Sequence, residues 1–164
     1  KQAAKTMNFL TEHGISSYGE LESKLNAVSA RRDTAHAEIK RIESRSAELA
    51  LVMKHAGTYR QIKPLYDRYR KSNDKEKFLR GHESEIILFE AAARELKRLG
   101  AVPLPTTESM KAEFANLNEE KERLLAEYKA ARTEAQEYDT VKQNVDALLA
   151  VPKEQKQQRR HELE

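Results

Sequence analysis

Apolar residues recur along two long stretches of the chain in alternating steps of four and three. The first series, in which all but Arg32 and Ser46 are apolar, is Leu21, Leu25, Val28, Arg32, Ala35, Ile39, Ile42, Ser46, Leu49, Met53 and Ala56. The second series is Met110, Phe114, Leu117, Lys121, Leu124, Tyr128, Ala131, Ala135, Tyr138, Lys142, Val145 and Leu149. This spacing is the heptad pattern of helices that pair along an apolar seam. It predicts two amphipathic helices of about 40 residues, each about 60 Å long.

Two seams of similar length, joined by an intervening segment, favour pairing within one chain. We therefore predict an all-α protein built around a long antiparallel hairpin of coiled-coil type, with Leu21 near Leu149. In that register the stems of Arg32 and Lys121 cross small residues of the facing helix and carry their charges to water. The alternative is that each helix pairs with another copy of the chain. The oligomeric state stays open, with a monomer favoured.

Turn residues divide the rest of the chain. A short helix is expected over 2–12, within an N-terminal segment of residues 1–16, with Ala3, Met7 and Leu10 as its apolar stripe. Gly14 ends this helix, and Ser17 with Glu20 forms a capping box for the first arm, residues 17–57. That arm ends where Gly57 interrupts the seam.

A small helical cap is expected between the arms, over residues 58–106. In it a helix over 59–72 is started or interrupted by Pro64, Asn73 caps the next helix, Gly81 breaks that helix, and Gly100 stops a last one over 84–99. The second arm covers residues 107–150, begins at a cap from Thr106 or Thr107, and ends at Pro152. Residues 1–152 thus form one helical domain. Residues 153–164 are predicted to be a disordered tail, and we interpret Leu163-Glu164 as residues of a tag junction.

Composition agrees with long, solvent-flanked helices. Of the 164 residues, 35% are charged and 38% hydrophobic, and five glycines and four prolines are too few for a β-sandwich or barrel. No apolar run approaches the roughly 20 residues of a membrane helix, so we expect no membrane partner. The absence of cysteine agrees with a cytoplasmic location. Because the chain opens at Lys1, we interpret it as part of a longer protein.

No pattern in the sequence indicates catalysis. The five histidines are scattered (His13, His36, His55, His82 and His161), and no two of them have the spacing of metal ligands on a helix. Carboxylates alternate with lysine and arginine as in ordinary surface pairs. There is no glycine-rich phosphate loop and no nucleophile elbow. We therefore predict no catalytic residue, no metal, no cofactor and no enzymatic activity for this chain.

Positive charge is concentrated between residues 58 and 80. The net charge of the chain is +3, but this stretch carries eight cations and three acids, a net +5, so the remainder sums to −2. The cations are Arg60, Lys63, Arg68, Arg70, Lys71, Lys75, Lys77 and Arg80. Basic residues interleaved with tyrosines can hold phosphates and stack on unpaired bases. The alternative is that Tyr59, Tyr66 and Tyr69 pack the cap and that the cations form a solvated face.

Three groups of residues carry a resemblance to a known family. They are residues 3–15 (AAKTMNFLTEHGI), then Gly57-Thr58-Tyr59 with Tyr69-Arg70-Lys71-Ser72, then residues 85–92 (EIILFEAA) followed by Leu99-Gly100 and Leu104-Pro105. In this order they resemble the C-terminal region of relaxases, the mobilisation nucleases of conjugative transposons and mobile plasmids in Gram-positive gut bacteria. The resemblance covers nearly the whole chain, to about Pro152.

The resemblance implies a parent protein that nicks one DNA strand at a transfer origin, using an N-terminal domain with a tyrosine nucleophile and a histidine-bound metal. This chain has no such histidine cluster, so no catalytic residue is carried over. It is then expected to be a non-catalytic accessory module, with DNA or relaxosome and coupling proteins as partners. The alternative is a structural or protein-docking hairpin that does not contact nucleic acid.

Overall fold

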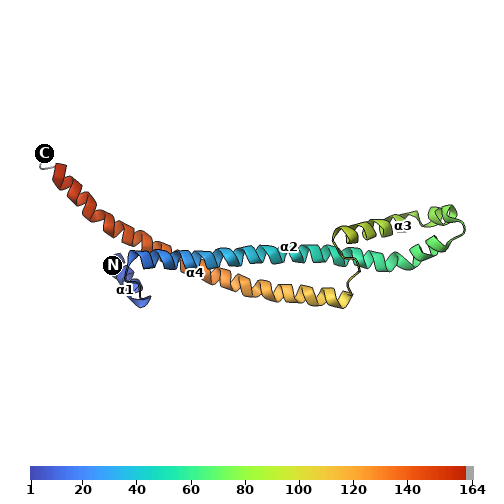
Figure 1. The fold of residues 1–164 in the computed structure, drawn as a ribbon, viewed down its shortest axis with the longest axis horizontal. Helices are drawn as coiled ribbons and strands as arrows, with labels where there is room; N and C mark the ends of the chain where they lie inside the picture. Colours follow the sequence, from blue (N-terminus) through green and yellow to red (C-terminus); the bar gives the residue numbers. More distant parts are fainter. Residues whose placement is uncertain (162–164) are drawn as a thin grey trace. The chain divides into compact units, whose positions relative to one another are not determined.

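The computed structural model describes the backbone of residues 1–161 and the side chains of residues 1–150. Over this part of the chain there are four helices and no strand, which confirms the prediction of an all-α protein (Figure 1). The helices are α1 (Gln2–Glu12), α2 (Tyr18–Lys71), α3 (Lys75–Arg98) and α4 (Thr107–His161).

The chain divides into two compact units. The first, unit 1, consists of residues 1–39 and 123–164, and the second, unit 2, of residues 40–122. Helices α2 and α4 both contribute to each unit. Their side chains contact each other in both, as Tyr18 with Asp146 in unit 1 and Arg45 with Glu113 in unit 2 show, so the predicted pairing of the two long helices within one chain is confirmed.

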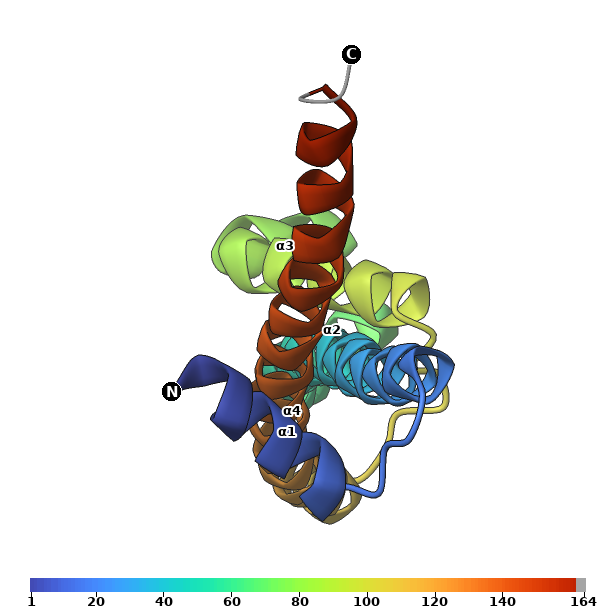
Figure 2. The same ribbon diagram turned by 90° about the vertical axis from the view of Figure 1, so that its left-hand side faces the viewer.

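Unit 1 combines α1 with the first part of α2 and the last part of α4. Its core consists of Ile15, Leu21, Val28, Ala135, Tyr138 and Val141. Helix α1 lies across α4 (Figure 2), where the ring of Phe9 meets the ring of Tyr138 edge-on at 5.2 Å between centroids. The predicted stripe of α1 is only partly correct, because Met7 is 59% exposed while Thr6 is buried. Burial of Thr6 is tolerated because its hydroxyl donates to the Gln2 carbonyl at 3.0 Å and accepts from the Asn144 amide at 3.3 Å.

The turn from α1 to α2 forms as the sequence predicts. Gly14 has a φ of 63°, a left-handed conformation that glycine adopts without strain. The amide of Ile15 donates to the carbonyl of Leu10 at 2.8 Å, which closes a Schellman-type end. The Ser17 hydroxyl then accepts from the amide of Glu20 at 3.1 Å. The reciprocal half of the capping box is displaced by one residue, because the Glu20 carboxylate accepts from the amide of Ser16.

The register of α2 on α4 in unit 1 differs from the predicted one. Tyr18 donates a hydrogen bond to Asp146 at 2.6 Å, and Arg31 pairs with Glu134 at 3.3 Å, so the numbers of facing residues add to about 164. The predicted facing of Leu21 and Leu149 requires a sum of about 170 and is wrong, since Leu149 is 58% exposed. Both registers bury a heptad seam, and the polar and charged pairs that flank it favour the observed one.

Unit 2 contains the second seam contact and the helix pair formed by the end of α2 with α3. Its fully buried anchors include Ile42, Leu49 and Met110. Ion pairs flank the α2–α4 contact: Arg45 holds both carboxylate oxygens of Glu113, at 2.7 and 3.1 Å, and Lys121 lies 3.3 Å from Glu43. Opposite charges therefore face each other across this helix contact.

Helix α2 does not end at Gly57 and is not broken at Pro64, contrary to the sequence prediction. It continues to Lys71. A glycine in a helix costs about 1 kcal/mol and a proline about 3 kcal/mol. Packing offsets these costs, because Val52 and Ala56 are buried on one side of Gly57 and Tyr66 stacks on Phe89 of α3 beyond Pro64. Residues 58–71 thus belong to the same helix as the first arm.

Helix α3 begins one residue later than predicted and is kinked. Asp74, not Asn73, caps it by accepting from the amide of Lys77 at 3.1 Å. The break expected at Gly81 appears as a kink at His82, with φ −138° and ψ 26°, and the helix resumes. Its end is as predicted, because Gly100 has a φ of 70° and the amide of Ala101 donates to the carbonyl of Leu96.

Helix α4 starts as predicted, with the Thr106 hydroxyl accepting from the amide of Ser109 at 3.0 Å. Its backbone remains helical through Pro152 to His161, so the predicted end at Pro152 is wrong. A proline removes a single backbone donor, and the lysine, glutamine and arginine around it are good helix formers. The tail prediction for residues 162–164 lies outside the described residues.

Candidate nucleic-acid interface

The eight cations singled out in the sequence lie on the second half of α2, up to its last residue, and on the first turns of α3. All eight are exposed. The structure divides them into two groups according to what their side chains contact.

Arg60 and Lys63 are engaged in contacts within unit 2. The Arg60 guanidinium donates to the Thr107 hydroxyl at 2.7 Å and to the Pro105 carbonyl, and so holds the segment that leads into α4. The Lys63 ammonium pairs with Asp67 at 2.9 Å, one turn further along α2, and this hydrogen bond raises the pKa of Lys63. These two residues therefore have structural roles.

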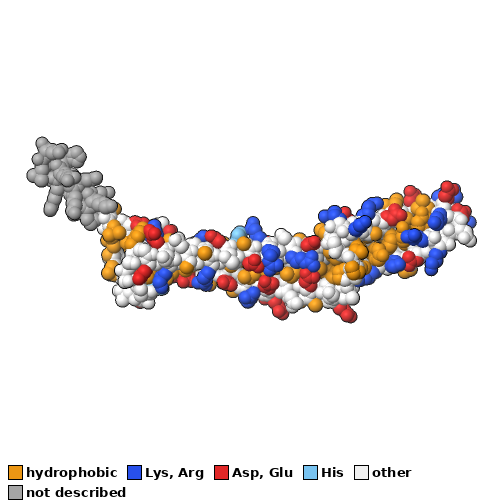
Figure 3. Space-filling model, viewed as in Figure 1, with side chains coloured by type: hydrophobic (Ala, Val, Ile, Leu, Met, Phe, Trp, Pro, Cys, Tyr) orange, Lys and Arg blue, Asp and Glu red, His pale blue; other side chains and the backbone are white. Residues whose placement is uncertain are grey.

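The other six cations gather around the turn between α2 and α3, and we call them the tip cluster. They are Arg68, Arg70, Lys71, Lys75, Lys77 and Arg80. Only Asp74 and Glu76 oppose them within residues 68–80, which leaves six cations against two acids, a net +4. Figure 3 shows Lys and Arg side chains near this end of the helix pair, beside a strip of apolar side chains between α2 and α3.

Most of the tip cluster has no counter-charge within the described residues. The Arg68 guanidinium lies 5.9 Å from the centroid of the Phe78 ring, a cation–π contact. None of the other five takes part in an ion pair or side-chain hydrogen bond in the part of the chain that the structure describes. Their charged groups are thus available to a ligand in solvent.

Helix dipoles account for only half of the tip cluster. Arg68, Arg70 and Lys71 lie in the last turn of α2, where the negative end of the helix dipole favours cations by roughly 0.3–1 kcal/mol each. Lys75 and Lys77 lie in the first turn of α3, where the same dipole disfavours them by a similar amount. The stability of the helices therefore does not explain the lysines of α3.

The tyrosines between these cations pack the helix pair. Phe89, which is 5% exposed, lies between Tyr59 and Tyr66, with ring centroids 4.7 and 4.2 Å away. Tyr69 lies 5.8 Å from Tyr66 and 6.0 Å from Phe78. This arrangement is the packing alternative raised for the tyrosines, so the tip cluster offers charge and not a platform for bases.

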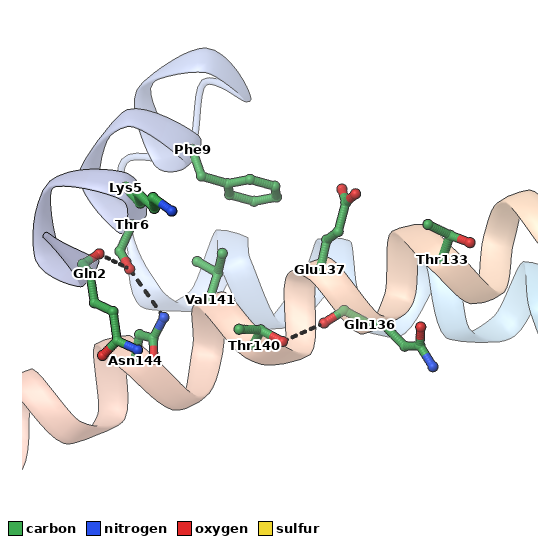
Figure 4. A pocket seen from close by; sticks show the side chains of 10 residues that line it. All are labelled: Gln2, Lys5, Thr6, Phe9, Thr133, Gln136, Glu137, Thr140, Val141 and Asn144. Atoms are coloured by element: carbon green, nitrogen blue, oxygen red, sulfur yellow. Dashed lines mark hydrogen bonds between the residues drawn. The ribbon is translucent and has the colours of Figure 1, made fainter.

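The described residues offer little else for chemistry. No group of three or more His, Asp or Glu side chains among them is arranged to hold a metal ion. A groove of about 510 Å³ lies between α1 and α4 in unit 1, where Phe9 and Val141 lie between polar side chains such as Thr6 and Thr140 (Figure 4). The sequence pattern did not indicate this groove, because it depends on how α1 lies across α4. Its walls carry no nucleophile with an adjacent base.

Comparisons with family models, with curated proteins and with solved structures found no match to this chain. The class that the fold defines is an all-α protein of paired long helices. No helix over the described residues combines the length and apolar character of a membrane span.

Proposed function

We propose that this chain is a non-catalytic accessory module of a conjugative DNA relaxase, and that its tip cluster binds the phosphates of DNA. The observation that carries the proposal is the set of six exposed cations around one turn. The resemblance of the sequence to relaxase C-terminal regions supplies the biological context.

The two lysines at the start of α3 give this proposal its physical support. Asp74 and Glu76 offset part of their unfavourable interaction with the helix dipole. A phosphate near the first turn of α3 would be favoured both by the dipole and by Lys75, Lys77 and Arg80. The cost of placing lysines there is then recovered when an anion binds.

The expected mode of binding follows from which groups are available. Because the tyrosines are engaged with Phe89 and Phe78, contacts would be made to phosphates and not to bases. Phosphate contacts alone give weak, nearly sequence-independent binding, with a Kd of roughly 10⁻⁴ to 10⁻⁶ M at physiological salt.

The test compares two variants that lose the same charge at different places. One replaces Lys71, Lys75 and Lys77 of the tip cluster with glutamine. The control replaces Lys54, Lys97 and Lys111, which are also exposed lysines of unit 2, with glutamine. Binding of labelled DNA oligonucleotides is followed by fluorescence anisotropy over a range of salt concentrations, after circular dichroism has shown that both variants keep their helix content.

The tip variant should bind more weakly, and the slope of log K against log salt should fall by about one for each lost phosphate contact. The control should keep the slope of the unchanged protein. Equal losses in both variants would mean that DNA senses only the net charge, and the proposed interface would be wrong.

A second candidate function, docking of another protein, is favoured by one observation. Ile87 and Leu88 are adjacent on α3 and are each 54% exposed, so they offer apolar surface that a protein partner could cover. If the tip variant binds DNA as the unchanged protein does, and Ile87→Ser with Leu88→Ser abolishes capture of a relaxosome protein, this second function is the better one.

A further inference from the structure

A row of hydrogen-bond donors crosses the contact between α2 and α4 in unit 1, well separated in sequence from the tip cluster. Arg32 and His36 come from successive turns of α2, and Tyr128 and Arg132 from successive turns of α4. Together with Asp33 and Gln136 they line one shallow groove of about 440 Å³.

The antiparallel register places these side chains opposite one another. Facing residues in unit 1 have numbers that add to about 164, as Tyr18 with Asp146 and Arg31 with Glu134 show. By the same register His36 faces Tyr128, and their ring centroids are 5.6 Å apart. By this register Arg32 and Arg132 lie opposite each other on the two helices, and both line this groove.

This facing of two arginines is an exception among the contacts of the long helices. The other charged pairs between α2 and α4 join opposite charges: Arg31 with Glu134, Arg41 with Glu120, Lys121 with Glu43 and Arg45 with Glu113. Like charges placed opposite each other across a contact between two helices are destabilising. Asp33 balances only Arg32, whose Nε donates to it at 3.0 Å, and Arg132 has no ion pair or hydrogen bond within the described residues.

A long side chain that covers the apolar seam explains why residue 32 is an arginine, but it does not explain the arginine at position 132. Arg32 occupies a seam position, where its stem can pass over the small buried residues Ala131 and Ala135. Arg132 is exposed and lies outside the seam, so a neutral side chain there would cost no packing and would remove the repulsion.

We propose that Arg32, His36, Tyr128 and Arg132 form a binding site for a phosphate-type oxyanion. The two η nitrogens of Arg32 and the whole guanidinium of Arg132 present forked donors that match oxyanion geometry. The imidazole of His36 and the phenol of Tyr128 add two more donors at one end of the row. An anion between the arginines converts their repulsion into two attractive contacts. The site stands independently of the DNA-binding role proposed for the tip cluster.

The first test measures binding of inorganic phosphate to the whole chain. Isothermal titration is carried out at constant ionic strength, with chloride as the balancing anion, and nuclear magnetic resonance follows the backbone amides. The unchanged protein should bind saturably, with shifts at residues 32–36 and 128–136. Arg132→Gln should weaken binding by about tenfold or more, because it removes charge-assisted hydrogen bonds.

The matched control is Arg31→Gln, which removes the arginine of α2 that precedes Arg32 in the sequence and pairs with Glu134 outside this groove. It should leave phosphate binding unchanged. A second measurement separates the site from a folding defect: without phosphate, Arg132→Gln should melt at the same temperature as the unchanged protein or higher, because it relieves repulsion. The proposal is overturned if the unchanged protein shows no saturable phosphate binding. It is also overturned if the Arg132→Gln variant binds phosphate as tightly as the unchanged protein.

A further arm identifies the source of the phosphate. Arg132→Gln is introduced into the tip variant, and the tip variant with and without this change is titrated with a single-stranded oligothymidylate. A loss of oligonucleotide affinity caused by Arg132→Gln supports the site with a phosphodiester as its ligand. Unchanged oligonucleotide affinity together with lost phosphate binding supports the site with a free phosphate. Because the tip cluster is already altered in both proteins, failure of the tip proposal does not affect either result.

Discussion

Replacement of Ile42 by alanine tests whether the seam of unit 2 supplies the stability of the fold. Ile42 is fully buried in the contact between α2 and α4. A matched control exists in the same unit, because Ile87 of α3 is 54% exposed. Isoleucine is replaced by alanine at both positions, so the two variants differ only in the surroundings of the side chain that is shortened.

The expected magnitude follows from burial. Isoleucine to alanine removes three carbons, and at about 0.8 kcal/mol for each buried methylene the transfer loss at Ile42 is about 2.4 kcal/mol. A void that does not collapse adds up to roughly 2 kcal/mol, at about 24 cal/mol per Å³ over roughly 80 Å³. Alanine regains about 0.4 kcal/mol through its better helix propensity. Ile42→Ala should therefore lower the free energy of unfolding by about 2–4 kcal/mol.

At Ile87 less than half of the side chain is buried, and no closed void can form. The transfer loss is about 1 kcal/mol, and the gain in helix propensity reduces it to less than about 1 kcal/mol. Urea unfolding followed by helical circular dichroism gives both values, provided that the slope with denaturant is the same in the two variants. Equal losses for Ile42→Ala and Ile87→Ala would show that the α2–α4 seam is not packed as described.

Three further predictions concern polar contacts and activity. The hydrogen bond from Tyr18 lowers the pKa of Asp146, so this contact stabilises the fold above the ordinary carboxyl pKa of 3.8, and the stabilisation is lost as the pH falls below that value. Tyr18→Phe should therefore destabilise unit 1 at neutral pH and match the unchanged protein in strong acid. A difference in stability that persists in acid would contradict this. A double-mutant cycle of Arg45→Ala and Glu113→Ala should give a coupling energy of about 0.5–1 kcal/mol, because both side chains are partly exposed. This coupling energy should decrease with added salt, and a salt-independent value would rule out the electrostatic explanation. The purified chain should not nick supercoiled plasmid DNA with any divalent metal, and nicking that disappears when one tyrosine is changed would disprove a non-catalytic role.

Sequence periodicity was enough to predict elements whose residues interact locally. The bounds of α1, the stops at Gly14 and Gly100, and the pairing of the two long helices all follow from spacing, backbone freedom and capping. These features depend on residues within a few positions of one another or on an apolar face of constant direction.

Features set by contacts between distant residues could not be predicted in the same way. The persistence of α2 through Pro64 depends on the rings of Tyr66 and Phe89, which are more than twenty residues apart in the sequence. The register of α2 on α4 depends on which polar side chains meet at the edges of the seam, and a heptad pattern leaves that choice open. The same holds for the site at Arg32 and Arg132, because only the observed register brings them to face each other.

The six tyrosines give each unit its own optical signal. The chain has no tryptophan, so tyrosine supplies all of its intrinsic fluorescence. Tyr18, Tyr128 and Tyr138 belong to unit 1, whereas Tyr59, Tyr66 and Tyr69 belong to unit 2. The Tyr18 hydroxyl donates a hydrogen bond to the Asp146 carboxylate, and such a bond quenches tyrosine emission, while the stacked rings around Phe89 should give a strong near-ultraviolet dichroic band. Fluorescence recovery therefore reports the loss of the Tyr18–Asp146 contact in unit 1, and weakening of that band reports the loss of the ring stack in unit 2, without any added label.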